Sequence, residues 1–227
     1  MEEEKKQDKS KLREWVETIV FALVLALIIR TFIIQPFKIP SESMIQTLKV
    51  GDHLFALKFM YGLPVPFTDK HFFEWHDPCR GDIVVFRPPF YPDNGALKRM
   101  IAPPLRIITK PVSLLFGEKF YVDLDSHKDF IKRILGLPGE EISIKDDTVH
   151  INGEPLDEDY LYLFESFYSL PKEDFGPVVV AEDSYFVMGD NRRNSRDSRY
   201  WGFLHKDLIK GKAFILYWPP NRIGLIK

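Results

Sequence analysis

The first long pattern in the chain is an apolar run near the N-terminus. Ile19 to Ile29 reads "IVFALVLALII", without a polar or charged side chain. Extended through Val16 and Ile34, the stretch has 19 residues, and as a helix it would reach about 28 Å, enough to cross a hydrocarbon core. Its central turns carry no polar face, which a helix packed in a soluble core would normally have. The pattern therefore predicts a transmembrane helix over residues 15–34.

A cleaved secretory signal is one alternative for this run, since such signals also contain an apolar core. The following residues, "RTFIIQPFKIP", hold no small-x-small cleavage pattern, which disfavours cleavage. Five lysine and arginine side chains precede the span, and the first ones clearly beyond it are Lys38 and Lys49. Because positive charge is enriched in cytoplasmic flanks, we expect residues 1–14 to form a cytoplasmic tail and residues 35–227 to form an exported domain on the outer side of the cytoplasmic membrane.

Short apolar runs separated by Gly, Pro, Asn and Asp dominate the sequence after the span, which favours a mainly β domain. The predicted strands are "DIVVF" (82–86), "FIKRIL" (130–135), "EISI" (141–144), "SYFVM" (184–188) and "AFILYW" (213–218). The segment "TVHINGEPL" predicts a hairpin that turns at Asn152 and Gly153, because Asn-Gly suits a two-residue hairpin loop. We expect an antiparallel β-sheet catalytic domain with a small inserted cap.

Two regions have the composition of insertions into that domain. Residues 88–127 are rich in proline and contain the apolar patch "IITKPVSLLFG", and residues 157–180 are aromatic and acidic around "YLYLFESFYSL". Each could be an ordinary satellite of the core. Because both follow the predicted anchor on the same chain, each could also rest an apolar face on lipid.

Charge and cysteine content narrow the classes of function. The chain has 31 basic and 33 acidic residues and a net charge of −2, so no overall basic field favours nucleic acid. A single cysteine, Cys79, excludes an intramolecular disulfide and a zinc site of the multi-cysteine kind. No H-E-x-x-H or comparable cluster is present, and we expect neither a metal nor another cofactor.

One predicted strand places a lysine in an apolar row. Alternate side chains of a strand share a face, so Phe130, Lys132 and Ile134 lie on one side. Burial there disfavours the charged amine and lowers its pKa from about 10.4, and a neutral amine can take a proton from a serine hydroxyl. Two alternatives stay open: Lys132 can extend to solvent at a sheet edge, and "LKRM" offers the same Lys-Arg pair at Lys98.

Two polar loops carry hydroxyl groups that suit such an amine. "IPSESMIQTL" holds Ser41 and Ser43 in a proline-bounded loop shortly after the predicted span. "MGDNRRNSRDSRYWG" contains Ser195, and its Asp197 and Arg199 have the spacing of a charge pair that would fix the loop. Taken alone, each loop is typical of an ordinary surface turn.

Four motifs follow the apolar helix in order: "PSESM", "RGDIVVF", "IKRILGLPGEEI" and "GDNRRNSRDSRYWG". This arrangement resembles the type I signal peptidases, membrane-bound Ser/Lys endopeptidases that release exported proteins. The resemblance implies that Ser43 is the nucleophile, that Lys132 is the general base, that Ser41 donates to the oxyanion and that Ser195 holds the lysine amine. The further residues it implies are Asp197, Arg199 and Gly189 as support for the site, and Ile39, Pro40 and Met44 as the lining of the substrate pocket.

The same resemblance implies the substrates and one departure from the family. Exported preproteins would be cleaved at the outer face of the cytoplasmic membrane, with small residues such as alanine preferred at positions −1 and −3 from the cut. The partners would be preproteins and the lipid bilayer, without nucleic acid or metal. Where the family usually has proline, this chain has Gln46. Proline would fix φ and stiffen the loop, whereas glutamine adds a backbone N–H and conformational freedom.

Three other functions are weaker alternatives. A Ser-His-Asp hydrolase would use one of the six histidines, but no G-x-S-x-G elbow surrounds Ser43. A thiol protease built on Cys79 lacks an identifiable base in "HDPCRGD". A membrane-tethered β domain that binds preproteins without cleaving them would not require both Ser43 and Lys132.

Overall fold

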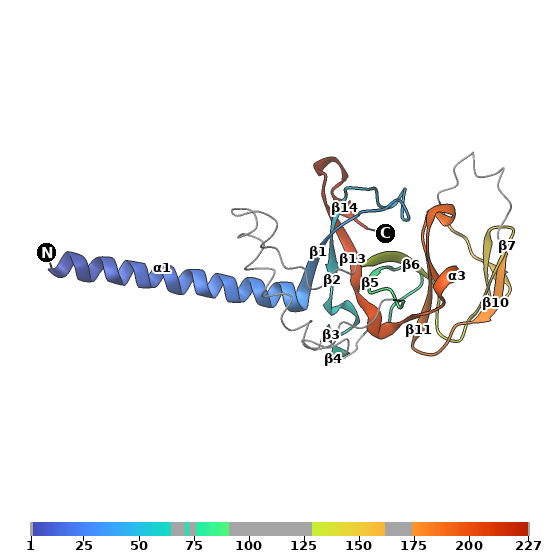
Figure 1. Cartoon of the computed structure of the whole chain (residues 1–227), viewed down its shortest axis with the longest axis horizontal. Helices are drawn as coiled ribbons and strands as arrows, with labels where there is room; N and C mark the ends of the chain where they lie inside the picture. Colours follow the sequence, from blue (N-terminus) through green and yellow to red (C-terminus); the bar gives the residue numbers. More distant parts are fainter. Residues whose placement is uncertain (1, 65–70, 73–75, 91–128, 162–173, 227) are drawn as a thin grey trace.

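A long N-terminal helix projects away from a β-rich body (Figure 1). In a computed structural model of the protein, residues 2–64, 71–72, 76–90, 129–161 and 174–226 are described. Helix α1 (Glu2–Ile28) is followed by a π-helical turn, η1 (Ile29–Ile33), and strand β1 (Ile34–Lys38) then enters the body.

The predicted span over residues 15–34 is not found as a single helix. Within the described part of the chain, no helix combines the length and the apolar character needed to cross a membrane. Helix α1 ends at Ile28, and the last apolar residues of the predicted span belong to η1 and to the start of β1.

The body is built on an antiparallel sheet of eight strands. Its order is β1-β2-β13-β5-β6-β11-β12, with β14 paired to β13. Besides β1, the strands are β2 (His53–Leu57), β5 (Ile83–Phe86), β6 (Phe130–Gly136), β11 (Ser184–Met188), β12 (Leu204–His205), β13 (Ile209–Trp218) and β14 (Gly224–Leu225). Strands β3 (Leu63–Pro64) and β4 (His71–Phe72) form a separate pair. The short helices are η2 (Phe59–Tyr61), η5 (Arg192–Asn194), α3 (Ser198–Trp201), η6 (Lys206–Leu208) and η7 (Pro220–Arg222).

A second sheet is inserted in the chain between β6 and β11. It has the order β10-β7-β8-β9 and comprises β7 (Glu141–Lys145), β8 (Thr148–Ile151), β9 (Glu154–Pro155) and β10 (Phe175–Val179). The predicted hairpin is confirmed, because Ile151 pairs with Glu154 around Asn152 (φ 52°) and Gly153 (φ 87°). This sheet is the main described part of the expected cap, and the prediction of a mainly antiparallel β domain is also confirmed.

The central strands of the large sheet are buried on both faces. Val85 packs on one side with Leu54 and Leu216, and Val84 packs on the other side with Ile134 and Val187. A third cluster, which includes Leu135, Ile142 and Phe186, joins β6 and β11 to the second sheet. Strand β6 therefore lies deep in the domain, with β5 on one side and β11 on the other.

The two predicted insertions fall largely outside the described residues. Of residues 88–127 the structure describes 88–90, and of residues 157–180 it describes 157–161 and 174–180. Their contact with lipid stays a prediction.

Candidate active site

Ser43 and Lys132 meet in the interior although they are 89 positions apart in the chain. Lys132 Nζ donates a hydrogen bond of 2.6 Å to Ser43 Oγ and one of 3.0 Å to the carbonyl oxygen of Ile131. Both side chains are buried, with 8% of Ser43 and 3% of Lys132 exposed. The sheet-edge alternative for Lys132 is excluded, because β6 has a partner strand on each side and Lys132 pairs with Val84.

Burial also changes the acidity of the amine. It lowers the pKa of Lys132 from its ordinary 10.5 to about 8, although the nearby carboxylates of Asp197 and Asp190 act in the opposite direction. Desolvation prevails because the charged form loses its water shell among side chains such as Phe130, whose ring centre is 5.5 Å from Nζ. Around pH 8 a large share of Lys132 is therefore neutral, and the neutral amine can accept the proton of the Ser43 hydroxyl.

The loop that carries Ser43 is a tight turn between β1 and β2. Its backbone is closed by hydrogen bonds from Ile45 N to the carbonyl oxygen of Glu42 (3.0 Å) and from Leu48 N to that of Met44 (2.7 Å). Met44 and Leu48 are buried in the core and fasten the loop to the sheet. This packing leaves the Ser43 side chain directed at Lys132.

Gln46 lies in this loop with a positive φ of 81°. A proline ring holds φ near −65°, so proline does not fit the backbone found here. The expectation that proline would stiffen this loop does not apply to this conformation. Glutamine is compatible with this positive φ, although a side chain in the left-handed region raises the free energy of the folded state.

A pocket of about 290 Å³ opens beside the pair. It is lined by Ile39, Pro40, Ser41, Ser43, Met44, Asp129, Phe130, Ile131, Lys132, Asn194 and Arg196. The three residues expected in the substrate pocket, Ile39, Pro40 and Met44, all line it. Ser41 lies at its exposed rim, with its Oγ 3.4 Å from that of Ser43. Asn194 and Arg196 were not predicted, because a polar loop gives no sign of which side chains face a distant strand.

The loop after β11 packs directly against Ser43. A Cβ atom on Gly189 would lie 2.4 Å from both the carbonyl oxygen of Ser43 and Oγ of Ser195, closer than real Cβ contacts. The next contact is a hydrogen bond of 3.1 Å from Asn191 N to the same Ser43 carbonyl. Only glycine at position 189 lets the two loops approach this closely.

Asp197 and Arg199 form the predicted charge pair. Asp197 is fully buried, and its carboxylate accepts from Arg199 Nε at 2.9 Å and from Gly189 N at 3.2 Å. It also caps helix α3 by accepting from Arg199 N. The pair therefore ties the loop to the end of β11.

The hydrogen bond expected between Ser195 and the amine is not formed. Ser195 is buried against Gly189, and its Oγ has no hydrogen-bond partner among the described residues. Lys132 Nζ has the carbonyl oxygen of Ile131 as its second acceptor instead.

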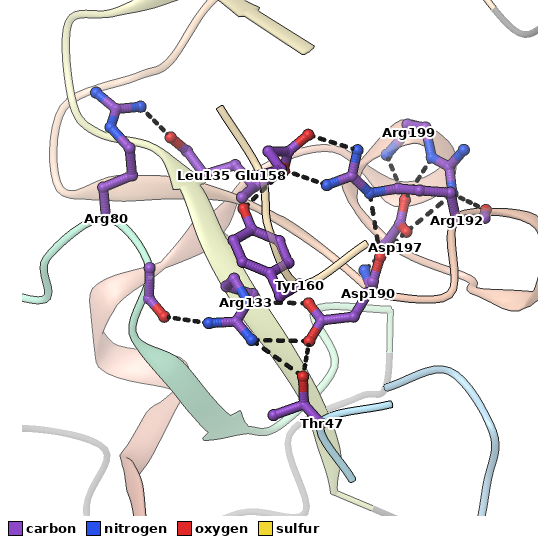
Figure 2. Close-up of polar contacts among 12 residues, drawn as sticks. Thr47, Arg80, Arg133, Leu135, Glu158, Tyr160, Asp190, Arg192, Asp197 and Arg199 are labelled. Carbon is purple, nitrogen blue, oxygen red and sulfur yellow. Dashed lines mark hydrogen bonds and ion pairs between the residues drawn. The ribbon is translucent and has the colours of Figure 1, made fainter. Parts of the chain in front are cut away.

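Sequence reasoning missed a buried ionic network next to this site (Figure 2). Arg133 follows Lys132 on β6, and its guanidinium donates to both carboxylate oxygens of Asp190, at 2.9 and 2.8 Å. Thr47, in the loop that carries Ser43, donates to Asp190 Oδ2 at 2.6 Å. The pattern of strand alternation could place Arg133 opposite Lys132, but its partners come from segments 57 and 86 positions away.

The residues of the rival sites lie elsewhere. No histidine or cysteine lines the pocket among the residues that the structure describes. Cys79 is exposed in a turn, and its thiol contacts the carbonyl oxygen of Asp77. The described ranges contain no group of three or more His, Cys, Asp or Glu side chains that could hold a metal ion. Lys98, the alternative lysine, lies outside the described residues.

Comparison with known proteins gives a consistent family. A family model described as "Signal peptidase, peptidase S26" matches residues 12–218. Signal peptidase I from Leptolyngbya laminosa is 39% identical over 95% of this chain and 84% of its own length. Probable signal peptidase I-2 from Synechocystis sp. is 37% identical over 99% of this chain and 83% of its own.

Two further similarities come from firmicutes. Signal peptidase I P from Bacillus subtilis subsp. natto is 34% identical over 98% of both chains. The crystal structure of a signal peptidase I from Enterococcus faecalis V583 is 29% identical and has a TM-score of 0.38 over 60% of this chain and 97% of that chain. The family match and the nearly full-length relatives show that this protein belongs to the signal peptidase family, peptidase S26, and is a serine endopeptidase that removes signal peptides.

Proposed function

We propose that Ser43 is the nucleophile of this endopeptidase and that Lys132 is its general base. The observation that carries the proposal is the 2.6 Å contact between Lys132 Nζ and Ser43 Oγ in a buried site. A pKa of about 8 supports the role of Lys132, because a base works best when its pKa is near the working pH.

The proposed reaction is an acyl transfer in two halves. Neutral Lys132 takes the hydroxyl proton as Ser43 Oγ attacks the scissile carbonyl carbon. Lys132 then gives that proton to the departing amine, which becomes the N-terminus of the mature protein. In the second half, Lys132 takes a proton from water, which attacks the acyl-enzyme and releases the signal peptide, while Ser43 Oγ regains a proton from the lysine.

The oxyanion of each tetrahedral intermediate needs hydrogen-bond donors. We assign this role to the Ser43 backbone N–H and the Ser41 hydroxyl. Ser41 Oγ lies 3.4 Å from Ser43 Oγ at the pocket rim, close enough to approach the carbonyl oxygen of a bound substrate. Because one hydroxyl donor of this kind contributes about 10²-fold or more to kcat, Ser41→Ala is expected to lower kcat while Ser43 stays buried beside Lys132.

The pocket supports the family's preference for small residues at −1 and −3. Its apolar wall includes Ile39, Met44 and Phe130, and its volume of about 290 Å³ has to accommodate substrate next to the dyad. Because the substrate backbone and both side chains share this volume, small residues at −1 and −3 are expected to fit without displacing buried Met44.

We further propose that the apolar part of α1 and η1 anchors the enzyme in the cytoplasmic membrane. Large apolar side chains are exposed along α1 at Trp15, Phe21, Leu23 and Leu25, with Phe21 68% exposed. Positions 21 and 25 share one face of a helix and position 23 lies on the opposite face, so apolar surface lies on both sides of α1 and would be covered by lipid. Protease added to intact spheroplasts should digest the β domain, and protection there would refute an exported domain.

The dyad is tested with the full chain in detergent and a preprotein that carries alanine at −1 and −3. Ser43→Ala and Lys132→Ala should each abolish cleavage, and the double variant should lose little more, because the two residues act as one unit. Lys145→Ala, at an exposed position at the end of β7, should cleave normally. Cleavage by Ser43→Ala at the wild-type rate would refute the assignment.

A further inference from the structure

Glu158 and Tyr160 lie just after β9, in the segment that leaves the second sheet. Neither residue lines the pocket or takes part in the proposed reaction. Both contact buried arginines of other segments: Glu158 binds Arg192, and the Tyr160 ring lies against Arg133. We propose that these four residues form a clamp that positions the Ser43/Lys132 pair and thereby sets the rate of catalysis.

The first half of the clamp is the Glu158–Arg192 ion pair. The Arg192 guanidinium donates to both carboxylate oxygens of Glu158, at 3.0 Å to Oε2 and through a second contact to Oε1. The side chains are 2% and 6% exposed. Arg192 Nε donates in addition to the carbonyl oxygen of Gly189 at 3.2 Å. A two-point ion pair from the second sheet thus holds the backbone of the loop after β11.

The second half is the contact between Tyr160 and Arg133. The Arg133 guanidinium carbon lies 3.8 Å from the centre of the Tyr160 ring, a cation–π geometry. The Tyr160 hydroxyl donates to Glu158 Oε1 at 2.6 Å, which joins the two halves. The same guanidinium also donates hydrogen bonds to both carboxylate oxygens of Asp190.

These contacts close a ring around one peptide unit. Arg133 holds the Asp190 side chain, Arg192 holds the carbonyl of the preceding residue, Gly189, and both arginines meet at Glu158 and Tyr160. Figure 2 shows the ring, with Tyr160 between Glu158 above it and Arg133 below it. The Gly189–Asp190 turn is therefore fixed from two sides, by Arg133 of β6 and by Arg192 of η5, and both arginines contact residues of the segment after β9.

The turn transmits this restraint to both members of the dyad. The loop lies against the Ser43 carbonyl at Gly189, where an added Cβ atom would come within 2.4 Å of the oxygen, and Asn191 N donates a hydrogen bond to that oxygen. Arg133 is the neighbour of Lys132 on β6, so the grip on Asp190 also fixes the strand that carries the base. A shift of about 1 Å in such a pair is enough to lower the rate by about 10²-fold.

The test uses Tyr160→Phe and Glu158→Gln, which keep size and shape. Tyr160→Phe removes the hydrogen bond to Glu158 but leaves a ring over Arg133, and Glu158→Gln removes the charge that pairs with Arg192. This inference rests on the proposed dyad. We expect kcat of each variant to fall by about 10-fold or more with KM nearly unchanged, because no clamp residue lines the pocket. The double variant should lose little beyond the larger single loss, as expected for one connected ring.

Two further readouts separate positioning from simple loss of fold. Active-site titration counts competent enzyme, and kcat is expressed per active site. In addition, the midpoint of the rising limb of kcat against pH should move upward, because a loosened turn admits water and lets the pKa of Lys132 return toward 10.5.

A matched control is an ion pair between η5, the short helix that carries Arg192, and the turn that joins β7 to β8. Arg193, next to Arg192, pairs with Asp147 of the second sheet at 2.5 Å, outside the ring. Asp147→Asn should leave kcat and the pH midpoint unchanged. The clamp is refuted if both clamp variants keep the wild-type kcat and midpoint per active site, or if Asp147→Asn lowers kcat equally. Failure of the dyad itself would appear separately, as cleavage by Ser43→Ala.

Discussion

Replacing Lys132 by methionine tests whether the proposed general base is buried at a cost to the stability of the fold. Methionine keeps the length of the side chain and removes the amine. Burial lowers the pKa of Lys132 from 10.5 to about 8, and one pKa unit corresponds to about 1.36 kcal/mol. Charging the amine in the folded protein therefore costs about 3 kcal/mol more than charging it in the unfolded chain.

The sign of the pH dependence follows from this difference. Because the pKa is lower in the folded state, the unfolded chain binds more protons between pH 8 and 10.5, and the free energy of unfolding rises with pH in that window. The wild type should gain about 3 kcal/mol from this residue across it, and the variant should gain nothing. Below pH 8, the variant avoids the charging cost of about 3 kcal/mol but loses two hydrogen bonds of about 1 kcal/mol each, so it should be the more stable protein by about 1 kcal/mol.

The assay is urea unfolding of the full chain in one detergent, followed by tryptophan fluorescence from pH 6.5 to 10.5. The quantity of interest is the difference in free energy of unfolding between wild type and Lys132→Met, because titration of all other groups cancels. Lys145→Met, at an exposed position, should give a difference that hardly changes with pH. A constant difference for Lys132→Met as well would refute the idea of a desolvated amine.

Three further outcomes are expected. The rising limb of kcat/KM against pH should have its midpoint near 8. It should survive in Lys58→Met, although burial lowers the pKa of Lys58 to about 8 as well, because Lys132 is the lysine that donates a hydrogen bond to Ser43. Gly189→Ala should lower kcat by about 10²-fold or more, since its Cβ would displace the Ser43 carbonyl. In thermal unfolding, Gln46→Gly should stabilise the protein by about 1 kcal/mol and Gln46→Pro should destabilise it, given φ 81°; a more stable proline variant would contradict this backbone.

The fold could be predicted where local signals are strong. Alternation and turn residues indicated five strands, and Asn152-Gly153 indicated a hairpin. A second hairpin, at Asp146 and Asp147 (φ 50° and 69°), was missed because a pair of aspartates carries no glycine to mark positive φ. Strand β13 was expected to begin at Ala213 but begins at Ile209. Its first residues were missed because the lysines at positions 210 and 212 interrupt the apolar run, although this part of the strand pairs with β5.

The site residues were predicted from motifs, and the local pattern alone does not indicate which of them meet in the fold. A strand that carries Lys132 can lie at an edge or in the centre of a sheet, and only the pairing of β6 with both β5 and β11 decides between them. The same holds for Glu158 and Tyr160, which read as part of an acidic, aromatic insertion. Their proposed role depends on Arg192, 34 positions from Glu158, and on Arg133, 27 positions from Tyr160. No periodic pattern in the sequence indicates that these residues meet.

Lys132 and Arg133, neighbours on β6, are both buried but differ in how their positive charge is stabilised. Arg133 is 3% exposed and is matched by both oxygens of Asp190, so its charge is compensated in the interior. Lys132 is equally buried, but no carboxylate of the described residues lies within ion-pair distance of it. Losing the proton therefore takes less free energy than keeping the charge in the interior, and the pKa of Lys132 is lowered. An arginine could not respond in this way, because its guanidinium stays protonated in proteins. The proposed mechanism therefore requires lysine at position 132, where a proton must move, and arginine at position 133, where a fixed charge must hold a loop. Exchanging the two residues should remove both functions.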